Sequence, residues 1–337
     1  MKPNVVLSRV WTAILLGLCA DVGVNAQDAD LVAAMTDIAA LTGEPSVLSA
    51  AGLTNEMDRL LTVENTSAMS PADTRRRVVL VAGLDGDRSS ADMAVEAVRW
   101  FKSVADPKIR SKWSISALPF ANPGKQQSLS FPPEDGFYND AAVPETRYVW
   151  RWVTYQAPDV VIELRVGPEI DVITGPKSHR SLMDALSNPN NGNGLGDVRT
   201  LVVTVPDGAI SQVLPSVLED VVERSPLREH LQRRLVREPL AIARLLAERY
   251  PGTPGMAYIP SVAWAHTLRL ASLVRDPTLR AKVLREVDPW LSGEQPIVGE
   301  RISFAGLAGT MVFSELQRVD QVDQNRAQQL ADQGVSL

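Results

Sequence analysis

Charged side chains follow an apolar, strand-like segment of this chain at the point where the segment ends. The run Val78–Leu84 is followed within a few residues by Asp85, Asp87 and Arg88, in a turn that contains two glycines. A short run of small and β-branched residues is typical of a central strand that is buried in a parallel sheet. Because open α/β sheets bind ligands at the carboxyl ends of such strands, we expect chemistry at these three charged residues.

A second apolar segment, Asp159–Val166, carries Glu163 and Arg165 near its end. Alternate residues of a strand share one face, so Glu163 is expected beside Arg165, where it can orient the guanidinium. If the two strands are neighbours in one sheet, Asp85 and Arg88 should converge with this pair. The sequence therefore predicts one shared site of mixed charge at the carboxyl edge of the sheet.

This mixed charge allows two interpretations. In the first, the acids and arginines form salt bridges that only stabilise the fold, since buried ion networks need no ligand. In the second, the arginines bind a carboxylate, which a guanidinium can hold through two parallel hydrogen bonds. The sequence leaves both interpretations open.

The beginning of the chain has the pattern of a secretory signal. Lys2 and Arg9 precede an apolar run from Val10 to Cys19, and a small-x-small cleavage site ends at Ala26. The run is too short for a good membrane span. We expect residues 1–26 to be removed and the mature protein to be periplasmic or secreted. Cys19 is the single cysteine of the chain, so cleavage would leave no thiol for catalysis, disulfides or metal binding.

The composition is that of a soluble globular protein that does not span a membrane, with 45% hydrophobic and 22% charged residues among 337. A net charge of −6 argues against nucleic acid as a partner. The basic run Arg75–Arg77 is interpreted as a solvated turn that enters a strand.

Strand and helix patterns alternate until about residue 224, and only helical patterns follow. The alternation predicts a mixed, mostly parallel sheet sandwiched by helices over residues 28–224, followed by an all-helical segment over residues 225–337. Residues 28–53 are expected to form a short helix and a polar connection, and residues 170–197 a long loop. Strands are predicted at 59–64, 78–84, 113–119, 159–166 and 200–205.

Several segments in this order resemble the zinc carboxypeptidases (the funnelin-like metallopeptidases). They include VVLVAGLDGD from Val78, SISALPFANPG from Ser114 and DVVIELR from Asp159, and the resemblance covers about residues 59–222. It implies a carboxypeptidase-like α/β fold. In that family a His-x-x-Glu pair and a third histidine hold zinc, and the enzymes are hydrolases that act on peptides.

The zinc-ligand positions of that family are not kept in this chain. By resemblance, Asp85 stands at the first histidine, Arg88 at the glutamate and Arg165 at the third ligand. A guanidinium does not lose its proton and cannot bind zinc, so no cofactor is expected.

The leading functional hypothesis is therefore a ligand-binding or scaffold module with a degenerate metal site, recognising a carboxylate of a peptide or an acidic glycan. The alternative is an active hydrolase, either a metallocarboxypeptidase-type peptidase or part of a polysaccharide-degrading enzyme. The candidate binding residues are Asp85, Asp87, Arg88, Asn122, Glu163 and Arg165.

A second resemblance concerns the helical segment. Glu238–Ala243, Tyr258–Trp264 and Pro289–Glu294 are similar to the opening helices of α/α-toroid proteins related to unsaturated glucuronyl and rhamnogalacturonyl hydrolases. This resemblance implies that Tyr258, Trp264 and Trp290 stack against sugars. Aromatic residues at helix ends also pack into protein cores, and that alternative remains open.

Overall fold

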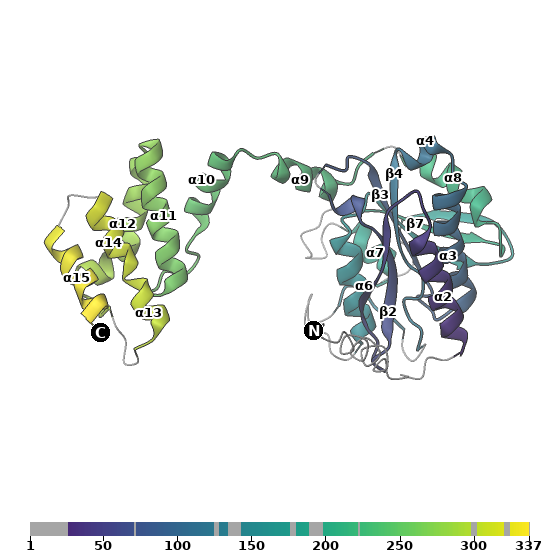
Figure 1. The fold of residues 1–337 in the computed structure, drawn as a ribbon, viewed down its shortest axis with the longest axis horizontal. Helices are drawn as coiled ribbons and strands as arrows, with labels where there is room; N and C mark the ends of the chain where they lie inside the picture. The colour runs from purple at the N-terminus through teal and green to yellow at the C-terminus, as the bar shows by residue number, and fades with distance from the viewer. Residues whose placement is uncertain are drawn as a thin grey trace, which may run out of the picture. The chain divides into compact units, whose positions relative to one another are not determined.

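The computed structural model describes residues 26–70, 72–124, 128–133, 143–175, 180–188, 198–221, 223–297, 302–319 and 324–336. The chain divides into two compact units, the first ending at Leu235 and the second beginning at Val236 (Figure 1). Residues 1–25, which make up nearly all of the predicted secretory signal, lie outside the described residues. Among the helices that are described, none is both long enough and apolar enough to cross a membrane.

The first unit is built on one mixed, seven-stranded sheet with the strand order β1-β2-β4-β3-β5-β7-β6. Its strands are β1 (Ser46–Leu53), β2 (Arg59–Asn65), β3 (Arg76–Ala82), β4 (Trp113–Leu118), β5 (Val160–Val166), β6 (Asp171–Thr174) and β7 (Arg199–Val205). The four central strands β4, β3, β5 and β7 run parallel to one another. The outer strands pair antiparallel, so the sheet is mixed as predicted, but its parallel part is confined to the centre.

Helices cover both faces of this sheet (Figure 1). On one face pack α2 (Ala26–Ala40), α3 (Arg88–Ser103) and α8 (Ile210–Glu219), and on the other α6 (Pro144–Tyr155) and α7 (Leu182–Ser187). Strand β3 is buried on both sides, because Leu80 packs into the first of these cores and Val81 into the second. A short 3-10 turn, η1 (Ser67–Met69), and the helix α4 (Pro107–Arg110) lie between strands.

Two strands were missed by the sequence prediction. The polar connection expected before Leu53 contains β1, and the long loop expected after Ile170 contains β6 and α7. Both strands lie at the outer edges of the sheet and keep most of their side chains exposed or half-buried. An edge strand buries too few side chains to show an apolar run or a clean alternation, which is why the pattern gave no signal.

Helix α9 (Pro226–Leu235) belongs to the first unit, although composition placed a boundary at residue 225. Leu227 packs into the core beneath α6 and α7. Arg228 is 7% exposed and its Nε lies 3.7 Å from a carboxylate oxygen of Asp159. The helix is therefore anchored to the start of β5, and the division of the chain comes after it.

The second unit is all-helical in its described residues. Its helices are α10 (Pro239–Arg249), α11 (Tyr258–Val274), α12 (Pro277–Leu291), α13 (Phe304–Gly309), α14 (Met311–Val319) and α15 (Gln324–Ser336). Trp264 and Trp290 pack against each other in its core, with ring centroids 6.0 Å apart and exposures of 0% and 7%. These two rings are core residues and present no platform to a sugar, whereas Tyr258 is exposed at the start of α11.

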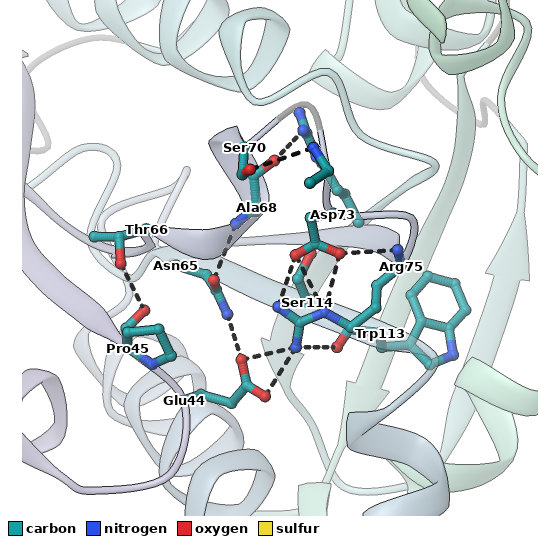
Figure 2. A network of polar contacts seen from close by, with 12 residues as sticks. Glu44, Pro45, Asn65, Thr66, Ala68, Ser70, Asp73, Arg75, Trp113 and Ser114 are labelled. Carbon is teal, nitrogen blue, oxygen red and sulfur yellow. Dashed lines mark hydrogen bonds and ion pairs between the residues drawn. The ribbon is translucent and has the colours of Figure 1, made fainter.

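The basic run Arg75–Arg77, whose last two residues begin β3, is not a solvated turn, so that interpretation was wrong. The Arg75 guanidinium donates to Asp73 at 2.7 Å and to both oxygens of Glu44 at 2.8 Å (Figure 2). Asn65 donates to the same glutamate, and the Arg76 guanidinium lies 4.6 Å from the ring centroid of Trp113. Burial opposes the ionisation of Asp73, but Arg75 outweighs this effect and holds the pKa of Asp73 below its ordinary value.

Replacing Arg75 with alanine should lower the free energy of unfolding of the first unit by about 3 kcal/mol, because two largely buried carboxylates would lose their partner. Chemical denaturation of the purified protein measures this change. Arg99 is exposed on α3, so Arg99→Ala is the matched control and should change stability by no more than about 0.5 kcal/mol. Equal effects of the two substitutions would contradict a stabilising role for the network.

Candidate functional site

A pocket of about 460 Å³ lies at the carboxyl edge of the central strands. Four of the six predicted binding residues line it, namely Asp85, Asn122, Glu163 and Arg165. They come together because β3 pairs in parallel with β5, and the residues after β3 therefore lie beside the end of β5. The predicted convergence of these strand ends is present, while their role in binding stays a prediction.

Apolar side chains from two other segments also line the pocket. They are Leu129 and Phe131 from the segment after β4 and Leu182 from the start of α7. Residues 170–197, which include Leu182, were predicted to form a loop, and none of these three residues was selected from the sequence. Their sequence carries no periodic signal that separates a pocket wall from a connecting loop.

Glu163 and Arg165 form an ion pair at the centre of the site. As predicted for alternate residues of one strand, the Arg165 Nε and one terminal nitrogen lie 2.6 and 2.5 Å from Glu163 Oε1. The Glu163 side chain is 6% exposed, whereas that of Arg165 is 53% exposed. A buried carboxylate thus anchors a guanidinium that remains accessible to solvent and to the pocket.

The buried carboxyl group of Glu163 has an altered acidity. Burial raises its pKa above the ordinary value, and the charge and hydrogen bonds of Arg165 reduce this rise only in part. The negative charge of Asp85 adds to the rise. A buried acid with a raised pKa beside a second acid in a pocket is a feature of functional sites, although structural networks also produce it.

Asp87 and Arg88 belong to the start of helix α3. Asp87 caps this helix, because its carboxylate accepts hydrogen bonds from the backbone N–H groups of Ser89 at 3.3 Å and Ser90 at 3.0 Å. Arg88 forms an ion pair at 3.1 Å with Asp92, one turn further along the helix. Neither Arg88 nor Asp87 is among the described residues that line the pocket, and that Arg88 joins Glu163 and Arg165 stays a prediction.

Hydrogen bonds between side chains and the backbone connect the segments that follow the strands of the site. Asn122 is 5% exposed, and its Nδ2 donates to the carbonyl of Leu84 at 3.2 Å. The Ser90 hydroxyl accepts a hydrogen bond at 3.1 Å from the backbone N–H of Val166, which joins the start of α3 to the end of β5. Sequence reasoning missed Ser90, because only the fold brings it to that strand.

The residues present do not fit the zinc ion that the family resemblance implies. Arg165 is bonded to Glu163 and Arg88 is paired with Asp92, so two of the three positions that the resemblance assigns to zinc ligands carry cations. In the part of the chain that the structure describes, no group of three or more His, Cys, Asp or Glu side chains is arranged to hold a metal ion.

Among known proteins, several solved structures are similar to this chain at low sequence identity. No protein-family model and no curated protein matches the sequence. A metallo-carboxypeptidase structure from Burkholderia cenocepacia is similar, at 14% identity and a TM-score of 0.39, over 52% of this chain and 58% of that one. The murein-tripeptide amidase MpaA from Escherichia coli O157 is similar at 14% identity and a TM-score of 0.36, over 55% of this chain and 95% of that one.

A third similar structure is the carboxypeptidase A of Helicoverpa armigera, with 11% identity and a TM-score of 0.35 over 53% of this chain and 56% of that one. This chain thus spans little more than half the length of both carboxypeptidase structures. At these scores the similarity assigns no activity and no site residue to the chain.

The raised pKa of Glu163 predicts a dependence of stability on pH. The folded protein binds this proton more tightly than the unfolded chain does, so the resulting stabilisation is complete below the ordinary pKa of 4.5. It is lost as the pH rises through the folded value. The free energy of unfolding of the wild type, relative to Glu163→Gln, should therefore fall over this window. Denaturation curves of both proteins between pH 4 and pH 8 measure this difference in the free energy of unfolding. Parallel pH profiles of the two proteins would contradict the raised pKa of Glu163.

Proposed function

We propose that the carboxyl-edge pocket binds a carboxylate group of a peptide or an acidic glycan, and that the protein is a binding module related in architecture to metallocarboxypeptidases. The observation that carries this proposal is the position of Arg165. Its guanidinium is half exposed at the pocket, while the buried Glu163 fixes its orientation.

The donors of this guanidinium suit the proposal. Glu163 accepts from Nε and from one terminal nitrogen, and the other terminal nitrogen of an arginine carries two further N–H donors. A pocket of about 460 Å³ has the size of a small-molecule site. The competing interpretation is that the ion pair only stabilises the fold. This interpretation requires no ligand, and the shift in melting temperature with a carboxylate ligand distinguishes the two interpretations.

A hydrolase is the alternative function, and the observation that favours it is the pair formed by Glu163 and Asp85. Two acids with different surroundings in one pocket can divide the roles of general acid and general base. Metal analysis of the purified protein, combined with assays on peptides and acidic oligosaccharides, tests this alternative. Stoichiometric zinc together with peptidase turnover would replace the binding proposal.

The localisation of the protein and the role of its second unit are also proposals. The pattern of residues 1–26 supports secretion or export to the periplasm. The packing of α11 against α12 and α14 supports a scaffold of helical hairpins like the start of an α/α toroid. N-terminal sequencing of the mature protein tests the first of these proposals.

A peptide with a free terminal carboxylate should raise the melting temperature of the wild type, and the same peptide with an amidated terminus should not. A ligand at a hundredfold excess over its dissociation constant adds about 2.7 kcal/mol of stability. Arg165→Gln removes the charge and should abolish the shift, while Arg99→Gln on the exposed face of α3 should keep it.

An acidic oligosaccharide and its neutral counterpart form the second arm of this experiment. A shift with either carboxylate ligand that depends on Arg165 identifies the ligand class. The absence of a shift with both ligands would leave only the structural interpretation of the ion pair.

A further inference from the structure

A larger cavity, of about 640 Å³, lies at the opposite, amino edge of the sheet, where β5 and β7 begin. Its buried wall includes Asp159, Thr200 and Ser225, and Arg199 and Arg224 also line it. No residue of the carboxyl-edge pocket is shared with it. It is therefore a separate candidate site.

Thr200 gives the first indication of a ligand. Its side chain is 2% exposed, and its Oγ1 has no hydrogen-bond partner among the described residues. A buried hydroxyl is costly when it is unpaired, and native structures pair nearly all of them. At a position inside a strand, valine would fill the same space without this cost. Thr200 lines the cavity, where a bound group can accept a hydrogen bond from its hydroxyl.

An excess of arginine around Asp159 gives the second indication. Asp159 already accepts from the backbone N–H groups of Arg77 at 2.8 Å and Ser225 at 2.9 Å. The guanidinium groups of Arg77, Arg224 and Arg228 all interact with its charge, and Asp73 is a further acidic neighbour of Arg77 and Arg228. Burial lowers the pKa of Arg228, and the positive charge of Arg224 lowers it further.

Two of these guanidinium groups also have unused donors. The Nε atoms of Arg77 and Arg228 are buried and form no hydrogen bond among the described residues. Buried charges are normally paired with opposite charges. Asp73 is already paired with Arg75, so Asp159 is left to balance three guanidinium groups, and an anion in the adjacent cavity can balance the remaining positive charge.

Three acids line the cavity and act against an anion, namely the buried Asp159, whose charge the neighbouring arginines offset, and two exposed acids. Asp220 and Glu223 line the cavity at its solvent side, where water and salt screen their charges. Arg199 donates to the backbone carbonyl of Asp220 at 3.1 Å, and Arg224 donates to the carbonyl of Thr74 at 2.6 Å. Each of these bonds uses one terminal nitrogen, and a guanidinium carries five N–H donors in all.

We propose that this cavity binds a small molecule through a phosphate or sulfate group, which Arg199 and Arg224 hold while the Thr200 hydroxyl donates a hydrogen bond. The planar fork of a guanidinium matches the oxygens of such groups. The start of α9 follows directly after Ser225, and its N-terminal backbone dipole adds a favourable field for an anion.

Titration calorimetry with inorganic phosphate and sulfate tests this proposal on the full chain, with sodium chloride of equal ionic strength as the reference. The wild type should bind at least one of the two oxyanions, and Arg224→Gln should weaken the binding at least tenfold. Thr200→Val should weaken it as well, yet leave the melting temperature of the free protein unchanged or raised, because it removes an unpaired buried hydroxyl. Weaker binding without a loss of stability would show that Thr200 contacts the ligand and does not act only through the fold.

Arg165→Gln at the other edge of the sheet is the control, and it should bind the oxyanion like the wild type. Failure of the carboxylate proposal would therefore leave this result untouched. If neither phosphate nor sulfate binds the wild type above the chloride reference, or if Thr200→Val binds like the wild type, the proposed site is wrong. Thr200→Val keeps the test decisive even if Arg224→Gln does not fold.

Discussion

The parallel pairing of β3 with β5 is the constraint on which the rest of the first unit depends. Both strands are buried on two faces, with Leu80 and Ile162 in one core and Val81 and Val161 in the other. The middle of such a strand has no solvent for a polar side chain. Charged residues are consequently gathered at the two edges of the sheet, and each edge carries its own cavity.

The two edges use charge in different ways. At the amino edge, Asp159 joins two other segments to β5, because it contacts the start of β3 and, at the start of α9, both Ser225 and Arg228. At the carboxyl edge, Glu163 has its ion-pair partner two residues away on its own strand. A contact between distant segments stabilises the fold, whereas a local pair on one strand orients a side chain. This difference favours a structural role for Asp159 and a binding role for Arg165.

The arginine at the carboxyl edge limits the chemistry of this pocket. A zinc ion polarises a bound water and brings it close to neutral acidity, but a guanidinium has no empty coordination position and cannot do so. It can only attract and orient an anion. The accessible Arg165 above a buried Glu163 is therefore suited to binding, and any hydrolysis in this pocket would have to use its acids.

The sequence by itself determined the central strands, the covering helices, the helical second part and the meeting of Asp85 with Glu163 and Arg165. These features depend on local periodicity and on side chains at strand ends, and both can be recognised within a few residues of the chain. The Glu163–Arg165 pair is the clearest case, because the alternation of a single strand is enough to place both groups on one face.

Only the tertiary structure decided the edge strands β1 and β6, the attachment of α9 and the buried position of Arg75. It also decided that Arg88 pairs along its own helix and that Thr200 lines a cavity. Edge strands bury too little surface to leave a periodic signal. A contact such as that between Arg77 and Asp159 joins residues 82 positions apart, and its existence depends on which strands become neighbours when the core packs.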